Sequence, residues 1–78
     1  MHVHVKLFSR LREHLPQEAK GEATIDLPDG ASVADLLNRL DLVQHAHVVS
    51  INDEREDDRG RPLRDGDSVR ILPFVVGG

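Results

Sequence analysis

The chain has 78 residues, enough for one small domain with a modest hydrophobic core and too few for two. Its residues are 38% hydrophobic and 31% charged, with two Phe and no Trp or Tyr, which is typical of a folded globular domain. The absence of cysteine excludes disulfides, thiolate metal sites and a cysteine nucleophile. The formal net charge is −4, without a basic stripe or interleaved aromatic residues, so we expect no nucleic-acid partner.

The first predicted strand is the alternating stretch HVHVKL at the start of the chain. Val3, Val5 and Leu7 alternate with polar residues, the period-two pattern of a half-buried strand. A short helix is expected next, in FSRLREHL, with Ser9 as its N-cap and Pro16 as its end. The alternation is unlike the apolar run of a signal peptide, and no stretch approaches membrane-spanning length. We therefore expect a cytoplasmic protein with no membrane partner.

A second strand and the main helix follow. Ala23, Ile25 and Leu27 alternate before the turn sequence PDG, so this strand is expected to pair with the first in antiparallel fashion. In SVADLLNRL, Ser32 is the predicted N-cap and Asp35 stands three residues later, as in a capping box. One face of this helix is apolar and must cover the sheet; its residues are Val33, Leu36, Leu37 and Leu40.

The rest of the chain reads as strands and polar connections. Val49 and Ile51 indicate a third strand, and the polar stretch NDEREDDRGRP leaves room for at most a short extra strand around Leu63. The sequence RDGD predicts a turn, after which Val69 and Ile71 alternate with polar residues in a last strand. The acidic run from 54 to 58 is expected to be a solvated loop, with a weak ion-pairing contact to a partner as the alternative.

This order of elements predicts an α+β fold, a mixed sheet of four to five strands covered by one main helix. Here the chain resembles the β-grasp, ubiquitin-like sulfur carriers of prokaryotes, and in particular the small subunits of molybdopterin synthase. The matching segments are residues 5–15, 25–40, 49–54 and 63–73 and the final Gly77-Gly78. We expect a β-grasp domain over residues 1–73 and a flexible tail over residues 74–78.

Two departures bear on the pathway that the resemblance implies. The molybdopterin-synthase subunits typically end in Pro-Pro-Val-x-Gly-Gly, whereas here Phe74 stands where the second proline would be. The thiamin-pathway carriers resemble this chain in the aliphatic residues before the glycines, but generally lack the helix after the first strand. That helix favours the molybdopterin type, and a carrier for thiamin or another sulfur-containing metabolite remains the alternative.

The Gly-Gly end is the candidate site for covalent chemistry. A carboxylate is a poor electrophile until it is activated, and adenylation with ATP followed by attack of a sulfur nucleophile would give a thiocarboxylate on Gly78. Gly77 would give clearance in another protein's active site, since it has no Cβ. The chain has no nucleophile paired with a base and no phosphate-binding loop, so we expect a carrier without bound cofactor and not an enzyme.

The resemblance implies three protein partners. They are an ATP-using adenylyltransferase that resembles the ubiquitin-activating enzymes, a sulfur donor enzyme, and a sulfur acceptor such as the large subunit of molybdopterin synthase. Two other functions stay open. One is a ubiquitin-like modifier that ends in an isopeptide bond, for which Lys6 and Lys20 are the chain's own acceptors. The other is a non-covalent β-grasp binding module in which the Gly-Gly end has no role.

Strand parity adds an expected partner surface. If Val69 and Ile71 face the helix, then Leu72, Phe74 and Val76 share the opposite face with Val48, and Val75 lies between them in the tail. Burying each such side chain contributes roughly 1.5 to 3 kcal/mol, so these residues are candidate anchors. The alternative is that Leu72 and Phe74 fold back onto their own domain.

Two His-x-His pairs raise the question of a metal site. His2 and His4 have the parity opposite to Val3, whereas His45 and His47 have the parity of the buried strand residues. The two pairs are therefore expected on opposite faces of the sheet, and we expect no metal site.

Overall fold

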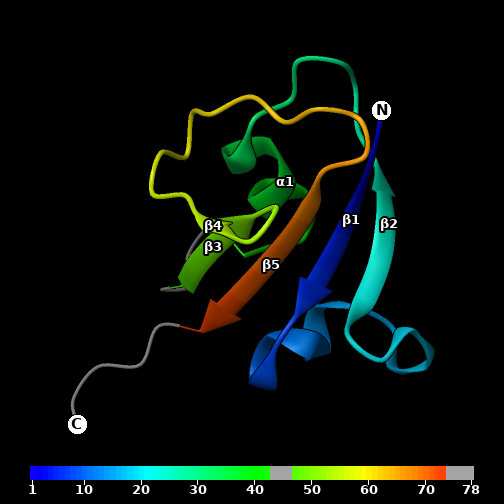
Figure 1. Cartoon of the computed structure of the whole chain (residues 1–78). Coiled ribbons are helices and arrows are strands. Elements are labelled where there is room, and N and C mark those ends of the chain that lie inside the picture. Colours follow the sequence, from blue (N-terminus) through cyan, green and yellow to red (C-terminus); the bar gives the residue numbers. More distant parts are fainter. Residues whose placement is uncertain (43–46, 74–78) are drawn as a thin grey trace, which may run out of the picture.

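A mixed five-stranded sheet carries α1 across one face, in the order β2-β1-β5-β3-β4 (Figure 1). The computed structural model describes residues 1–42 and 47–73. This is the β-grasp arrangement that the element order predicted. Its elements are β1 (His2–Leu7), η1 (Ser9–His14), η2 (Gln17–Ala19), β2 (Glu22–Asp26), α1 (Val33–Arg39), β3 (His47–Ile51), β4 (Glu54–Arg55) and β5 (Ser68–Pro73).

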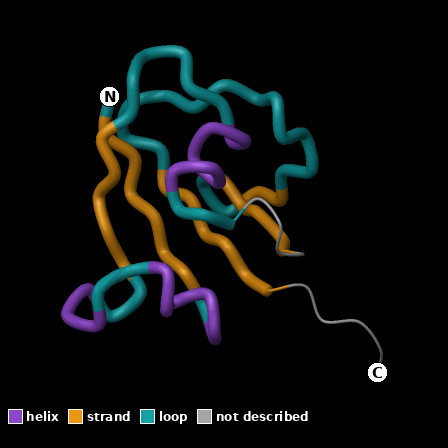
Figure 2. The backbone as a smooth tube through the Cα atoms, turned by 180° about the vertical axis from the view of Figure 1, so that it is seen from behind, coloured by secondary structure: helices purple, strands orange, loops and turns teal. Residues whose placement is uncertain are grey.

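Strand pairing gives the sheet two distinct ends. β1 pairs with β5 in parallel, with Leu7 opposite Ile71, while β2 and β3 run antiparallel to these central strands. We call the end at which β1 and β5 finish the tail end, and the end at which they begin the loop end. The 3₁₀-helices η1 and η2 lie at the tail end, and the long connection from β4 to β5 lies at the loop end (Figures 1 and 2).

The hydrophobic core lies between α1 and one face of the sheet (Figure 2). Seven odd-numbered residues of the three inner strands point into it, as the alternation predicted, and each is at most 1% exposed. They are Val3, Val5, Leu7, Val49, Ile51, Val69 and Ile71. From the other side α1 contributes Val33, Leu36 and Leu37. The even-numbered residues of these strands therefore form the opposite face, which we call the outer face.

The start of α1 is set by the predicted capping box. Ser32 Oγ accepts a hydrogen bond from the Asp35 backbone N–H at 3.3 Å, and the Asp35 carboxylate accepts from the Ser32 backbone N–H at 2.8 Å. Together the two bonds satisfy donors that a helix start otherwise leaves unpaired.

The helix after β1 differs in detail from the prediction. It forms, but as the 3₁₀-helix η1, and the predicted N-cap at Ser9 is wrong. Phe8 occupies the N-cap position without a side-chain cap bond, and Ser9 is the first helical residue, with φ of 53°. The segment has only six residues and connects two strands, and 3₁₀ turns are frequent in such connections.

The short extra strand was predicted at the wrong place. β4 is Glu54–Arg55, which pairs with the end of β3 directly after a tight turn in which Asn52 and Asp53 have positive φ. At the predicted position Leu63 is buried, but only an isolated bridge between Ser32 and Pro62 forms there. The apolar character of Leu63 reflects core packing. The hairpin was instead indicated by Asn52 and Asp53, because Asn and Asp tolerate the positive φ of a tight turn.

A buried carboxylate joins the two turns at the loop end. Asp67 is 7% exposed, and its oxygens accept from the Asn52 side-chain amide at 3.0 Å and from the Arg64 backbone N–H at 2.8 Å. Asn52 in turn accepts from the Ser68 backbone N–H at 3.0 Å. These bonds hold the β3–β4 turn against the start of β5. Across residues 1–42 and 47–73 no helix combines the length and apolar character needed to cross a membrane.

Asp67→Ala is expected to lower the free energy of unfolding by about 2 kcal/mol, since it removes two part-buried hydrogen bonds to a charged acceptor. Asp57→Ala is the matched control, because Asp57 is exposed and loses only a surface ion pair with Arg55, worth at most about 1 kcal/mol. Urea unfolding followed by far-ultraviolet circular dichroism measures both, and suits a chain without Trp or Tyr. Equal stabilities of the two variants would contradict this role for Asp67.

Candidate functional site

The covalent site predicted from the sequence follows directly on β5. This strand ends at Pro73, the last residue that the structure describes. Gly77 and Gly78, and the predicted anchors Phe74, Val75 and Val76, lie outside the described residues. Of the predicted site, Val48 and Leu72 are therefore the two residues that can be placed.

Val48 and Leu72 lie side by side on the outer face. They are register partners on β3 and β5, and their core-facing neighbours Val49 and Ile71 are buried. Leu72 is 37% exposed, and it is the one large hydrophobic side chain that is exposed in the described part of the chain. Leu72 thus does not fold back into its own domain. That the two residues bind a partner stays a prediction.

Phe8 extends this apolar surface to the end of β1, which the sequence did not indicate. It directly follows Leu7, has extended backbone dihedrals, and donates its backbone N–H to Ile71 O at 3.2 Å. The Lys6 ammonium lies 5.2 Å from the centre of the Phe8 ring, which places the ring on the outer face with Lys6. In the sequence, Phe8 matched the apolar period of the following helix, and this concealed its position.

Phe8, directly after β1, thus forms a row with Leu72 on β5 and Val48 on β3 at the tail end of the outer face. We call it the apolar row. It lies where β5 leaves the sheet, so a protein that takes up residues 74–78 comes directly against it. An apolar surface of this kind is suited to burial against a partner.

The predicted histidine pairs are only partly within the described residues. His2 and His4 are exposed on the outer face near the edge strand, with ring nitrogens 3.7 Å from an Asp26 oxygen and 3.6 Å from a Glu22 oxygen, respectively. His45 lies outside the described residues, and His47 is described only as a β3 residue in register with Pro73. Among the described side chains no group of three or more His, Asp or Glu is placed to hold a metal ion.

A depression of about 530 Å³ lies between η1 and η2, also at the tail end. Its lining combines the charged residues Arg12, Glu13 and Lys20 with the apolar Leu15 and Pro16. None of the residues of the apolar row lines it. The apolar row beside the exit of β5 therefore remains the candidate site.

The sequence model of the ThiS family matches residues 5–78, which includes the second half of β1, all other strands of the sheet and the Gly-Gly end. The chain belongs to the ThiS family. Over 87 aligned residues it is 36% identical to the molybdopterin synthase sulfur carrier subunit of Chlamydomonas reinhardtii, and the alignment covers 100% of both proteins.

Solved structures of this family type share the fold. A putative molybdopterin converting factor subunit 1 from Pyrococcus furiosus superposes with a TM-score of 0.75 at 28% identity, covering 96% of this chain and 99% of that one. A complex of subunits 1 and 2 of the molybdopterin-converting factor from Helicobacter pylori gives a match with a TM-score of 0.65 at 27% identity, covering 100% of both chains. The β-grasp fold predicted for this ThiS-family chain is thereby confirmed.

Substitutions at Leu72 and at its neighbour Ile71 test whether Leu72 belongs to the surface or to the core. Leu72→Ser is expected to change the free energy of unfolding by less than about 1 kcal/mol, because the side chain is already exposed. Ile71→Ala, its control, removes a fully buried side chain and is expected to cost about 2 to 5 kcal/mol. Urea unfolding of the two variants measures both. A large loss for Leu72→Ser would mean that Leu72 packs within the domain.

Proposed function

We propose that this ThiS-family protein is a sulfur carrier of the molybdopterin synthase small-subunit type. The observation that carries the proposal is the match of the family model through residue 78, together with full-length similarity to a protein named as a molybdopterin synthase sulfur carrier subunit. In this role the protein is a co-substrate, and the catalytic groups belong to its partners. Residues 1–73 serve as the recognition domain and residues 74–78 as the tail that carries the sulfur.

The chemistry takes place at the carboxylate of Gly78. An activating enzyme joins it to AMP, with release of pyrophosphate from ATP, and AMP becomes the leaving group. A sulfur nucleophile at the oxidation level of sulfide then attacks the carbonyl carbon, AMP departs, and the product is a thiocarboxylate. Gly77 leaves the approach to the carbonyl free of side chains.

The apolar row supports a docking role for the domain in this scheme. Leu72 and Phe8 flank the point where β5 ends, so a partner that binds them brings its active site within reach of the tail. We propose the large subunit of molybdopterin synthase as acceptor, because a structural neighbour was solved as a complex of subunits 1 and 2. The activating enzyme and the sulfur donor are proposed from the chemistry alone.

The intact mass of the protein purified from its native cells tests the proposal. The expected result is a species heavier by about 16 Da, the difference between sulfur and oxygen, with the change located at Gly78 when a sulfur nucleophile has replaced the activated oxygen. The same measurement reports whether Gly78 is the last residue. The chain has no cysteine, so labelling by a thiol-directed alkylating reagent at neutral pH also reports the thiocarboxylate sulfur.

A variant that lacks Gly78 is the matched control, and it should show neither the mass increase nor the label. The proposal is wrong if the wild-type protein keeps its unmodified mass even after incubation with the organism's activating enzyme, ATP and sulfide. Recovery of Gly78 joined to lysines of other proteins, without a thiocarboxylate pool, would instead identify a protein modifier.

A further inference from the structure

A pair of basic side chains lies next to the apolar row on the outer face. Lys6 and Arg70 are register partners on the parallel strands β1 and β5. Lys6 is two residues before Phe8, and Arg70 is two residues before Leu72, so all four side chains are on the same face. The basic pair and the apolar row thus form one continuous surface at the tail end.

This arrangement is unfavourable within the isolated domain. Like charges directly opposite each other on neighbouring strands destabilise a sheet. Lys6 also faces Glu22 on β2, but within the described residues the Glu22 carboxylate pairs with His4 at 3.6 Å and Lys6 contacts only the Phe8 ring. Arg70 lies 3.4 Å from an oxygen of the exposed Asp53, and surface pairs of this kind contribute at most about 1 kcal/mol.

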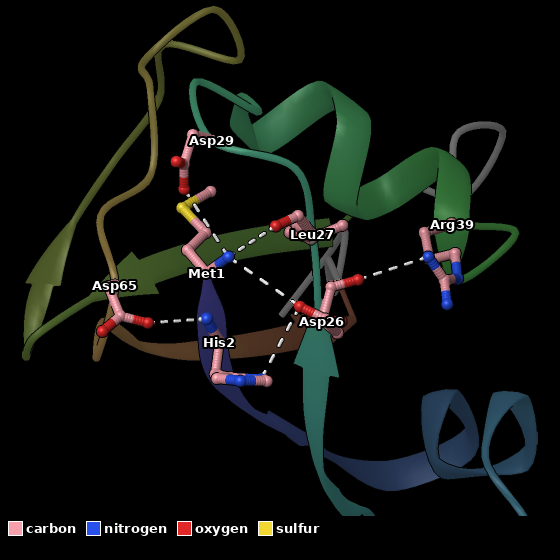
Figure 3. A network of polar contacts seen from close by, with 7 residues as sticks. All are labelled: Met1, His2, Asp26, Leu27, Asp29, Arg39 and Asp65. Carbon is pink, nitrogen blue, oxygen red and sulfur yellow. Dashed lines mark hydrogen bonds and ion pairs between the residues drawn. The ribbon is translucent and has the colours of Figure 1, made fainter.

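Basic groups at the loop end are placed quite differently. There the Met1 ammonium lies 3.8 Å from Asp26 and 3.6 Å from Asp29, and the Arg39 guanidinium donates to the Asp26 backbone oxygen at 3.4 Å (Figure 3). Four acidic residues lie at the loop end around the start of β1, namely Asp26, Asp29, Asp65 and Asp67. The fold therefore gathers negative charge at the loop end and leaves the basic pair beside the exit of the tail.

We propose that Lys6 and Arg70 select the partner of the carrier by pairing with carboxylates that flank an apolar recess on the partner's surface. This inference rests on the sulfur-carrier function proposed above and adds the chemistry of the docking surface. The occupant is a protein face with an apolar centre for Phe8, Leu72 and Val48 and with acidic side chains at the position of the basic pair. The acidic loop end of the carrier repels the same face, so the charges also orient the encounter.

Zero-length cross-linking with a carbodiimide tests the proposed pairing directly. The reagent joins an amine to a carboxylate only where the two are in contact, and the chain has two lysines, Lys6 and Lys20. In a mixture with the organism's molybdopterin synthase large subunit, peptide mass spectrometry should find Lys6 joined to an Asp or Glu of that subunit. Lys6→Arg, which keeps the charge but lacks the amine, should lose this cross-link. Cross-links at Lys20 without any at Lys6 would overturn the proposal.

Charge reversal measures the contribution of the pair to affinity. Lys6→Glu and Arg70→Glu are each expected to weaken binding to the large subunit by about tenfold at low salt, an effect that shrinks as salt screens the charges. Arg64→Glu, at the loop end, is the matched control and should change the dissociation constant by less than about twofold. Calorimetric titration at two salt concentrations gives these values. Reversals at Lys6 and Arg70 that bind as tightly as the control would refute the inference.

Two further measurements show whether a negative result comes from misfolding, from a wrong inference or from a wrong proposed function. Lys6→Gln removes the like-charge pair without placing a second carboxylate opposite Glu22, so its midpoint of thermal unfolding should be equal to or higher than that of the wild type. A lower midpoint together with weaker binding would assign Lys6 a structural role and contradict the inference. If the wild-type protein forms the thiocarboxylate and binds the subunit but ignores the charge reversals, the inference alone fails. If it does neither, the proposed function fails as well.

Discussion

The parallel pairing of β1 with β5 at the centre of the sheet is the constraint on which the rest of this structure depends. Because the two strands run the same way, the chain leaves β1 for η1 at the same end at which β5 finishes. The first and last strands of the chain are thus locked together by backbone hydrogen bonds, and the exit of the tail is held against the body of the domain. A carrier that must present its terminal residues needs such a fixed origin for them.

The two faces of this sheet serve different purposes, and whether a strand residue has an odd or an even number decides the face on which its side chain lies. The seven buried odd-numbered side chains of the inner strands meet α1 and supply the apolar burial that keeps a small domain folded. Even-numbered side chains have no covering layer, so their chemistry is free to vary along the strands. They are polar and ionic near His2 and His4, basic at Lys6 and Arg70, and apolar at Leu72 and Val48.

The change from polar to basic to apolar side chains along the outer face suggests how a carrier protein contributes to a reaction. Under the proposed function its contribution would be to deliver one carboxylate to several enzymes in turn, which requires a surface that each enzyme can recognise and release. An apolar row of three side chains is small enough for reversible binding, and charges beside it improve selectivity more than they raise affinity. The unfavourable pairing of Lys6 with Arg70 is the kind of local conflict expected where a surface is shaped by binding.

The sequence by itself determined most of the fold, and its failures were local. Alternation identified β1, β2, β3 and β5, and the Ser32–Asp35 pattern located the start of α1 to the residue, because both signals depend on near neighbours in the chain. The Ser9 cap failed because a short segment before Pro16 adopts 3₁₀ geometry. The strand at Leu63 failed because an apolar residue in a polar stretch is explained equally well by core packing in a loop.

What only the tertiary structure decided was which distant residues meet. Parity placed Leu72 on the outer face, but it did not place Phe8 beside it, and nothing in the local pattern set Lys6 opposite Arg70. Six acidic residues lie in the first 39 positions of the sequence and eight in the last 39, yet Asp26 from the first half and Asp65 from the second meet at the loop end beside His2. Local periodicity specifies the face on which a side chain lies, whereas its neighbours are set by strand order and register, which the packing of the whole chain determines.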